Sequence, residues 1–305
     1  MAARVSAVVV LYHPELPLLA AQQVAVLEQV DELVYIDNGG GQEAVEALAA
    51  GAVDPRVSVI GRGVNVGLAR ALNDGLAHVR QSSAAYALLL DQDSVPEPGC
   101  VATLLRGLDV AAEVVAAGPA IRDELTGQVE HFARLRLPLN SRIDPKHPPV
   151  SEFFDVDFLI TSGTLLRMDL LERAGPMDDA LFVDCIDFDW SFRARSRGLR
   201  LIATFATTLS HRRGDQIHQL PGGLPLRIHS ATRLYYMHRN RVRLYRRGYV
   251  PLAWKVHDIG RLVVKLALLL TFVPGRAARA SAVARGLRDG LRADPGARAV
   301  TGGSA

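Results

Sequence analysis

The chain has 305 residues, of which 49% are hydrophobic and 22% are charged, and these are ordinary values for a globular protein. This composition excludes a mainly disordered chain, and no period typical of collagen or of a coiled coil is present. The two cysteines, Cys100 and Cys185, are too few for a disulfide framework. We therefore expect one large or two small folded domains in a reducing compartment.

Neither a signal peptide nor a membrane-spanning helix is expected. The first apolar run, Val5–Leu11, is short and is followed at once by polar residues, without a small-residue cleavage site. The longest apolar run, Leu262–Val273, has 12 residues and contains Lys265, whereas a spanning helix needs about 20. The expected location is the cytoplasm, or a peripheral position on the inner face of the plasma membrane.

The net charge of +3 conceals a strong asymmetry along the chain. Residues 1–211 hold 17 Lys and Arg against 28 Asp and Glu, a balance of −11. Residues 212–305 hold 18 Lys and Arg against 4 Asp and Glu, a balance of +14. An acidic body followed by a basic region predicts that the basic region meets something anionic.

The first two hundred residues alternate short apolar runs with amphipathic stretches. Strands are predicted at Val5–Leu11, Glu32–Ile36, Val57–Ile60, Tyr86–Leu90, Val114–Gly118, Phe158–Leu166 and Ile202–Leu209. Helices are predicted at Leu16–Gln29, Glu43–Ala50 and Val66–Val79. This alternation predicts an α/β fold with a mostly parallel sheet covered by helices on both faces. Ligands bind beyond the carboxyl ends of such strands, so the polar loops that follow them are the expected site.

The segment LLLDQDSVP, residues 88–96, places Asp91, Gln92 and Asp93 at the end of an apolar strand. Two neighbouring carboxylates repel each other unless a cation lies between them or solvent screens them. Mg²⁺ and Mn²⁺ take oxygen ligands and leave room for substrate phosphates, so a metal site is one interpretation. The alternative is a solvated turn closed by Pro96.

Polar residues also follow two earlier strands. Asp37 could hydrogen-bond a base or a ribose, or it could form an Asx turn. Asn65 and Gly67 precede a predicted helix, which Asn65 could cap. Asn73 is unfavourable inside that helix, and this predicts a specific hydrogen bond. Arg70 could reach a diphosphate or remain solvated.

Three acids, Asp184, Asp187 and Asp189, lie just before or within the first turn of a helix predicted in LFVDCIDFDWSFRARSRG, residues 181–198. Capping and the helix dipole favour acids there, but one cap explains only one of the three. Trp190 beside them could stack on a sugar or belong to the core. His211 follows a strand in TTLSHRRGD, residues 207–215, where it could be structural or complete a metal shell with an Asp pair.

Taken in order, these segments resemble a family 2 glycosyltransferase, an inverting sugar transferase with the GT-A fold. The resemblance covers about residues 5–215 and rests on the order and spacing of VVVLYHPE, YIDNGG, NVGLARALNDG, LLLDQDS, ITSGTLLRM, FVDCIDFDWSFRARSRG and SHRRGD. The phrases TSGTLLRMDLLERAGPMDDALF and LFVDCIDFDWSFRARSRG are similar to the bacterial rhamnosyltransferase branch.

The resemblance implies a role for each of these residues. Asp187 matches the catalytic base, and Asp91 and Asp93 match the Asp-x-Asp motif that holds Mg²⁺ or Mn²⁺ and the nucleotide. His211 matches the later metal-binding histidine. The residues expected at the nucleotide-sugar donor are Tyr12, Asp37, Asn65, Gly67, Arg70, Asn73, Asp91, Gln92 and Asp93. Trp190 and Asp189 are expected at the acceptor.

The implied reaction moves L-rhamnose from dTDP-L-rhamnose, with inversion, to a hydroxyl of a glycan or lipid-linked glycan in cell-wall or surface polysaccharide synthesis. Galactofuranose, glucose and other hexoses stay open as the transferred sugar. The chain departs from the family pattern at two positions. Ile186 stands where a Glu usually precedes the base, as in the rhamnosyl-type branch. Leu72 stands where an Arg often precedes the helix Asn, which leaves the diphosphate contacts open.

The expected organisation is a catalytic domain over residues 1–225 and a basic amphipathic helical region over residues 226–305, frayed beyond Pro295. Basic residues flank its apolar stretches, as in a helix that lies on an anionic bilayer. The alternative is a helical pair packed on the body or at a homo-oligomer interface, with solvated arginines.

Two other classes of protein fit these residues less well. A catalytically silent nucleotide-sugar-binding protein is disfavoured by the intact Asp91, Asp93, Asp187 and His211. A nucleic-acid-binding protein is disfavoured by the acidic body and by the lack of a recognition motif.

Overall fold

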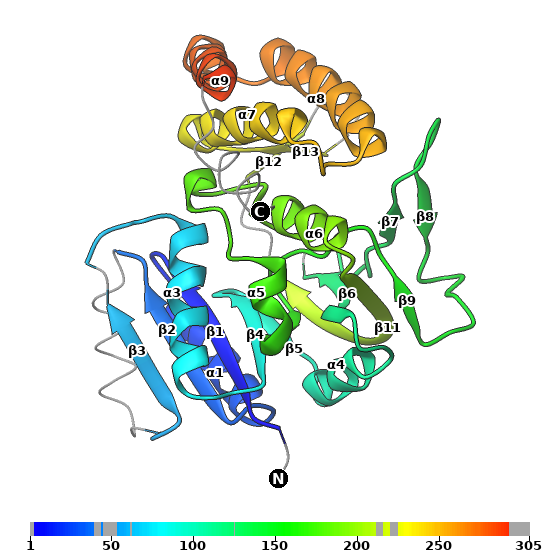
Figure 1. The fold of residues 1–305 in the computed structure, drawn as a ribbon. Helices are drawn as coiled ribbons and strands as arrows, with labels where there is room; N and C mark the ends of the chain where they lie inside the picture. Colours follow the sequence, from blue (N-terminus) through cyan, green and yellow to red (C-terminus); the bar gives the residue numbers. More distant parts are fainter. Residues whose placement is uncertain are drawn as a thin grey trace, which may run out of the picture.

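A central β-sheet organises the body of the protein (Figure 1). The computed structural model describes residues 3–39, 44, 54–61, 63–124, 126–211, 216–219 and 225–292. Within these residues the sheet has nine strands, in the order β3-β2-β1-β4-β10-β6-β11-β5, with β9 paired to β11. The strands are β1 (Val5–Leu11), β2 (Glu32–Asp37), β3 (Val57–Gly61), β4 (Tyr86–Asp91), β5 (Ser94–Pro96), β6 (Val114–Asp123), β9 (Phe153–Asp155), β10 (Thr164–Arg167) and β11 (Arg200–His211).

Four strands of this sheet, β3, β2, β1 and β4, run parallel to one another, as their apolar sequences predicted. The antiparallel strand β10 separates them from the parallel pair β6 and β11. Leu11 on β1 is in register with Asp37 on β2, and Val10 is in register with Asp91 on β4. The two acids therefore stand at the same edge of the sheet.

Helices cover both faces of the sheet, and each face has its own apolar core. Val8 and Val10 of β1 face α3 (Leu68–Gln81) and α6 (Ile186–Ser196). The alternate residues Ala7 and Val9 face α1 (Leu16–Leu27) and α4 (Cys100–Leu108). Short helical turns complete the body at Met168–Leu170, α5 (Leu171–Ala174) and Asp179–Leu181. Two small hairpins pair β7 (Phe132–Arg134) with β8 (Ser141–Ile143) and β12 (Gln216–Gln219) with β13 (Pro225–Ile228).

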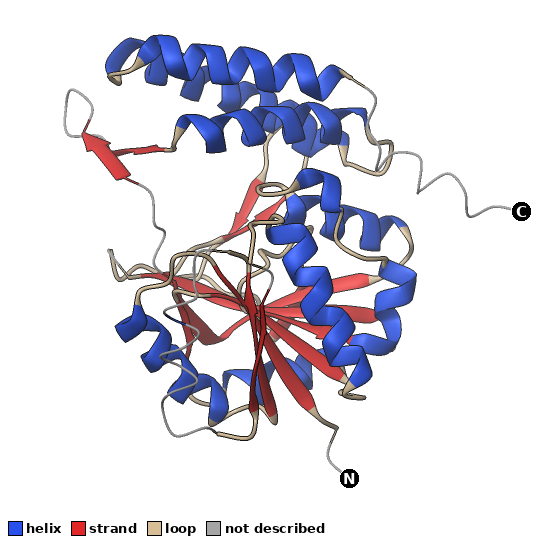
Figure 2. Ribbon diagram, turned by 90° about the vertical axis from the view of Figure 1, so that its left-hand side faces the viewer, coloured by secondary structure: helices blue, strands red, loops and turns tan. Residues whose placement is uncertain are grey.

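Three C-terminal helices form a further layer at one end of the sheet (Figure 2): α7 (Ala231–Arg246), α8 (Leu252–Phe272) and α9 (Arg276–Leu291). Helix α9 lies close against α7, because a Cβ added at Gly286 would sit 2.5 Å from the carbonyl oxygen of Tyr235. Leu244, Val250 and Trp254 join the same apolar core as α3 and α6. The C-terminal layer therefore packs firmly on the body.

One predicted strand is shorter in the structure than in the sequence analysis. Strand β10 begins at Thr164 rather than at Phe158. The preceding residues turn at Gly163, which has a φ of +84°, and the backbone of Leu159 bonds to the Ser191 hydroxyl instead of to a strand. The predicted helix Glu43–Ala50 and the tail beyond Pro295 lie outside the described residues. Within the part of the chain that is described, none of the helices combines the length and the apolarity needed to span a membrane.

Candidate active site

Asp91, Asp93 and His211 come together at the carboxyl end of β4. One ligand atom from each side chain lies within 4.8 Å of one from each of the others. His211 reaches this point from the end of β11, with Nε2 3.9 Å from Oδ2 of Asp91 and Nδ1 3.4 Å from Oδ1 of Asp93. Burial of the strand end raises the pKa of Asp91, which the His211 charge lowers and the Asp93 charge raises. Two carboxylates and one imidazole so placed form a site that a cation would stabilise.

Two buried serines hold this cluster in place. The Ser94 hydroxyl lies 2.7 Å from Nδ1 of His211, which leaves Nε2 on the side of Asp91. Ser162 donates a hydrogen bond of 2.7 Å to Ser94 and accepts one of 3.0 Å from the backbone N–H of Asp91. Partners of this kind fix the orientation of a histidine that binds metal. The interruption of the strand at Ser162-Gly163 thus places a hydroxyl where it links β4, β5 and β11.

Other residues predicted to bind the nucleotide-sugar donor lie at the same edge of the sheet. Asp37 is 7% exposed and accepts a hydrogen bond from the backbone of Gly39, so the Asx turn is present. Gln92 exchanges two hydrogen bonds with the backbone of Tyr12, at 2.7 and 3.0 Å, and thereby ties the ends of β1 and β4 together. The Tyr12 side chain remains 48% exposed beside them.

The loop before α3 is held by amide side chains rather than by a simple cap. Asn65 accepts hydrogen bonds from Asn38 and from the backbone of Gly67; it does not cap α3, whose N-cap position is held by Gly67. Gly67 has a φ of +91°, and a Cβ there would lie 2.5 Å from the ring of Phe182. Only glycine therefore lets the loop that precedes Asp187 pack against α3.

Asn73 makes the specific contacts that its position in a helix predicted. It donates to the Met177 carbonyl and to Asp179, and it accepts from the Met177 N–H. Arg70 is half exposed and pairs with Asp74 and Asp179. Both side chains tether α3 to residues 177–179, and their predicted contact with a diphosphate stays a prediction.

Asp187 lies in the first turn of α6, after an unusual stretch of backbone. Phe182, Asp184 and Cys185 have φ values of +65°, +64° and +66°. Each such conformation costs an L-residue about 1–2 kcal/mol, so this loop needs support from its surroundings. Strain of this kind, next to a candidate catalytic carboxylate, is expected where a side chain must be held in one place.

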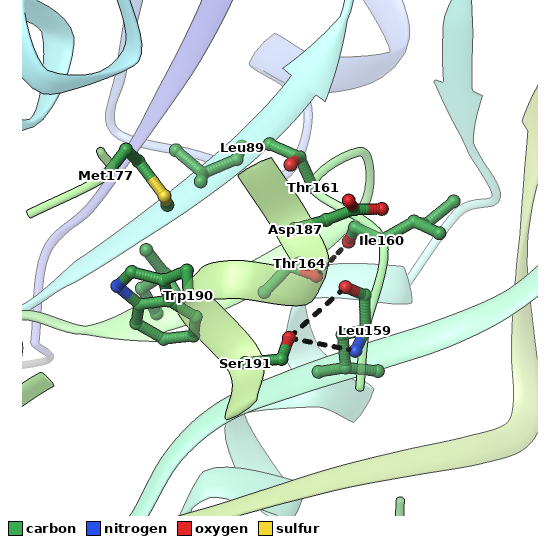
Figure 3. Close-up of a pocket in the computed structure, with 10 residues that line it drawn as sticks. Leu89, Leu159, Ile160, Thr161, Thr164, Met177, Asp187, Trp190 and Ser191 are labelled. Atoms are coloured by element: carbon green, nitrogen blue, oxygen red, sulfur yellow. Dashed lines mark hydrogen bonds between the residues drawn. The ribbon is translucent and has the colours of Figure 1, made fainter. Parts of the chain in front are cut away.

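The environment of the Asp187 carboxyl suits a proton acceptor. Figure 3 shows it at the start of α6, beside Thr161 and Ile160, where it lines a cavity of about 10 Å³. The pKa of Asp187 is raised to about 6, chiefly by burial; the hydrogen bond from the Phe188 N–H lowers it, and the charges of Asp184 and Asp91 add to the rise. The effect of Asp91 shows that the carboxyl shares one electrostatic neighbourhood with the Asp91, Asp93 and His211 cluster.

The predicted acceptor residues do not face an open cleft. Trp190 is 3% exposed, and its indole N–H donates to the Gly175 carbonyl, so it belongs to the core. In Figure 3 its ring projects from α6 in a different direction from Asp187. Asp189 is fully buried and bonds to Arg193, Arg247 and Tyr249. Stacking of Trp190 on a sugar and contact of Asp189 with an acceptor are therefore corrected to structural roles.

Helix α7 supplies residues that the sequence analysis missed. Asn240 is fully buried, and its amide nitrogen lies 2.8, 2.7 and 2.9 Å from the carbonyl oxygens of Leu181, Val183 and Asp184. Arg239 and Arg243 bind the carbonyls of the preceding residues 180 and 181. Asn inside a predicted helix was the available signal, as it was for Asn73. The basic face of α7 therefore meets the backbone before Asp187, and these two arginines are not merely solvated.

Arg233, at the start of α7, adds a cation to the site. It pairs with Asp184 at 3.1 Å, and its charge lowers the pKa of Asp91. The side chain is 44% exposed. Arg233 thereby forms an ion pair with the carboxylate whose charge helps to raise the pKa of Asp187.

The donor set of the cluster fits a divalent cation. Carboxylate oxygens with one imidazole nitrogen suit Mn²⁺ or Mg²⁺, and the Ser94 contact pre-orients His211. Asp91, Asp93 and His211 are the residues that would hold it.

Comparison with known proteins identifies the family. The model for "Glycosyl transferase family 2" matches residues 7–175, more than half of the chain. The chain belongs to glycosyl transferase family 2. This chain is 27% identical over 271 residues to the dTDP-rhamnosyl transferase RfbF of Shigella flexneri. The match covers 88% of this chain and 89% of RfbF.

Solved structures share the fold of this family 2 chain. A structure of GalNAc-T7 with UDP, GalNAc and Mn²⁺ superposes with a TM-score of 0.60 at 15% identity, over 95% of this chain but 56% of that chain. The mannosyltransferase PcManGT of Pyrobaculum calidifontis, with GDP-Man and Mn²⁺, gives 0.55 at 19% identity over 98% and 78%. S. aureus TarS 1–349 gives 0.57 at 15% identity over 96% and 81%. The predicted GT-A fold is thereby confirmed.

Proposed function

We propose that this glycosyltransferase moves L-rhamnose from dTDP-L-rhamnose to a hydroxyl of a glycan or lipid-linked glycan, with inversion, in cell-wall or surface polysaccharide synthesis. The observation that carries the reaction type is Asp187, a carboxylate with a raised pKa beside a separate cluster of Asp91, Asp93 and His211. The similarity to RfbF over most of both chains supports the choice of donor.

In the proposed reaction Asp187 accepts the proton of the acceptor hydroxyl while that oxygen attacks the anomeric carbon. The bond from this carbon to the diphosphate breaks on the opposite face, and the nucleoside diphosphate leaves. One displacement inverts the anomeric centre and needs no enzyme nucleophile. General-base help of this kind contributes about 10²–10⁴-fold to a rate.

The rest of the site is proposed to bind and orient the donor. A cation held by Asp91, Asp93 and His211 would offset the charge that develops on the diphosphate. Asp37 and Tyr12 lie where a nucleoside could be bound, at the ends of β2 and β1. Arg233 lies near Asp91 and can approach the diphosphate from α7.

The donor assignment is tested by thermal unfolding of the intact chain with Mn²⁺ and one nucleotide sugar at a time. A ligand at 100 times its Kd adds about 2.7 kcal/mol to the stability of the folded state. We expect dTDP-L-rhamnose to raise the melting temperature more than UDP-galactofuranose, UDP-GlcNAc or GDP-mannose does. A larger shift with one of the other donors would replace rhamnose by that sugar. Loss of the shift in a chelator, and its return with Mg²⁺ or Mn²⁺, is the expected outcome for the metal.

We also propose that α8 lies against an anionic membrane surface near the acceptor. Leu252, Val256, Ile259 and Val263 are 45–65% exposed and recur at helical spacing, which gives α8 an apolar outer face. Arg261 beside this face is 69% exposed. Co-sedimentation with phosphatidylglycerol vesicles at low salt, abolished by Val256→Asp with Val263→Asp, is expected. A dimer in solution that the same pair of changes dissociates would assign the face to a second copy of the chain.

A further inference from the structure

The buried face of α1 carries one polar side chain among apolar ones. Leu19, Gln22 and Val26 are the buried residues of this helix, and Gln22 is fully buried. An amide in such a position is unfavourable unless it is hydrogen-bonded, and Leu or Met would fill the same space without that requirement. The packing of α1 on the sheet therefore does not explain why a glutamine stands here.

The amide nitrogen of Gln22 spans the turn between β4 and β5, residues 91–94. Its Nε2 donates to the carbonyl oxygens of Asp91 and Ser94, each at 2.6 Å, so one side chain holds both ends of the turn. The Oε1 atom of Gln22 is buried and has no hydrogen-bond partner among the described residues. The two carbonyls set the orientation of the amide, because Oε1 in place of Nε2 would bring three acceptor oxygens together.

Each contact of Gln22 leads directly to a residue of the proposed cation site. Asp91 is one of the three ligands, and Ser162 holds its backbone N–H, so its backbone is fixed on both sides. Ser94 pairs in register with His211 across β5 and β11, and its hydroxyl lies 2.7 Å from Nδ1 of the histidine. A shift of turn 91–94 would therefore displace an acid and the histidine together.

A second glutamine holds the same turn, but at the surface. Gln92 exchanges hydrogen bonds with the backbone of Tyr12, and both of these bonds are exposed. Water can replace a partner that is lost there, whereas it has no access to the fully buried Gln22. Of the two glutamines, Gln22 is thus the one whose loss leaves carbonyls of the turn without a substitute donor.

We propose that Gln22 is a positioning residue for the cation site, and that it sets the placement of Asp91 relative to His211 by holding turn 91–94 from within the core. The role rests on the proposed function, because it acts through the cation that Asp91, Asp93 and His211 would hold. Removing an outer partner of a metal ligand typically weakens metal binding 10–100-fold. For Gln22 the lower end, about tenfold, is expected, because it acts through the backbone and not on a ligand atom.

The test is a titration of the full-length chain with Mn²⁺, without nucleotide sugar, followed by electron paramagnetic resonance. Gln22→Met keeps the size of the side chain and removes both donors, so it should raise the Kd for Mn²⁺ about tenfold. The spectrum of bound Mn²⁺ should change as well, because the ligands are displaced. Gln29→Met is the matched control: Gln29 follows the end of α1 and binds the backbone N–H of Val101, away from the turn, so its Kd should be unchanged.

A purely structural role of Gln22 predicts a different pattern. Both substitutions would then lower the free energy of unfolding, while the folded Gln22→Met chain would bind Mn²⁺ as the natural chain does, and this result would overturn the inference. If Gln22→Met does not fold, Gln22→Asn is measured instead. Its amide is one methylene shorter and cannot reach both carbonyls, so the Kd should rise again, and an unchanged Kd would equally reject the role.

Hydrogen exchange of the metal-free chain separates this inference from the cation site itself. The backbone of residues 91–96 should exchange faster in Gln22→Met than in the natural chain and in Gln29→Met, and equal exchange in all three would show that Gln22 does not hold the turn. Absence of Mn²⁺ binding by the natural chain would reject the cation site and the positioning role together. Binding that Gln22→Met leaves unchanged would reject the role of Gln22 alone.

Discussion

The acidic body and the basic C-terminal region differ in what their charges do. In the body, Asp91 and Asp93 gather with His211 at the end of β4, and Asp187 stands in the first turn of α6. In the C-terminal region several charges of α7 and its end are turned inward: Arg239 and Arg243 bind backbone carbonyls, and Arg247 binds the buried Asp189 and the partly buried Asp178. A basic region is therefore not by itself evidence of an anionic partner. Much of its charge completes the fold of the acidic half.

This difference predicts that substitutions of the acids in the body lower the transfer rate, whereas substitutions of the inward-facing arginines in the C-terminal region lower the stability of the fold. Asp187→Asn is expected to lower the transfer rate 10²–10⁴-fold, because the acceptor hydroxyl loses its base while the shape of the site is kept. Donor binding, measured by the thermal shift, should be unchanged. Glu28→Gln, an exposed acid at the end of α1, is the control. A variant of Asp187 with normal turnover would remove it from the role of base.

The largest loss of stability is expected from Arg247→Met. Arg247 is 3% exposed and joins Asp178 and Asp189, so its removal takes a cation from both acids and leaves Asp189 with Arg193 alone. Breaking a buried ion pair in this way typically costs about 3–5 kcal/mol, which is measured as the free energy of unfolding in urea. Arg285→Met on the exposed face of α9 should cost less than about 0.5 kcal/mol. Similar losses in both variants would erase the contrast between inward and outward arginines.

Asn240→Asp tests whether α7 supports the loop before Asp187. The change keeps the size of the side chain but removes the N–H donors that bind three carbonyls, so we expect a loss of roughly 2–3 kcal/mol. A fall in kcat with little change in the donor Kd should accompany it, because the loop no longer holds Asp187 in place. The same substitution at the exposed Asn140 is the control. If kcat is unaffected at a temperature where the variant is fully folded, α7 has no part in positioning the base.

The smallest effect is the pH dependence set by Asp187. With its pKa raised to about 6, only about one tenth of the carboxyl is ionised at pH 5, so the rate should fall about tenfold between pH 7 and pH 5. The folded chain also holds this proton more tightly than the unfolded chain, whose ordinary pKa is 3.8. Stability from this group is therefore lost as pH rises from about 4 to about 6, and Asp187→Asn should be the more stable form above pH 6. A flat rate profile over this range would contradict the assignment.

Much of the candidate site was predictable because its residues follow strands whose order can be read from the sequence. Parallel strands end at one edge, so Asp37 and Asp91 were expected at the same edge, and His211 approaches Asp91 because β11 ends there too. The roles of Trp190 and Asp189 were not predictable in this way. Neighbouring residues on a helix point in different directions, so a small rotation of the helix decides which side chain faces the core. The contacts of Trp190 with Gly175 and of Asp189 with Arg247 set this rotation, and they are seen only in the structure.

The sequence by itself determined the α/β architecture, the family and the cluster of Asp91, Asp93 and His211, because strand periodicity and loop chemistry act over short distances along the chain. Only the tertiary structure decided how the C-terminal region is used. Asn240 binds the carbonyls of residues 181, 183 and 184. Because every residue has a backbone carbonyl, the sequence does not indicate which carbonyl a distant side chain will bind. Contacts between a side chain and distant backbone are set by how whole helices pack, so the support of Asp187 by α7 appears only in three dimensions.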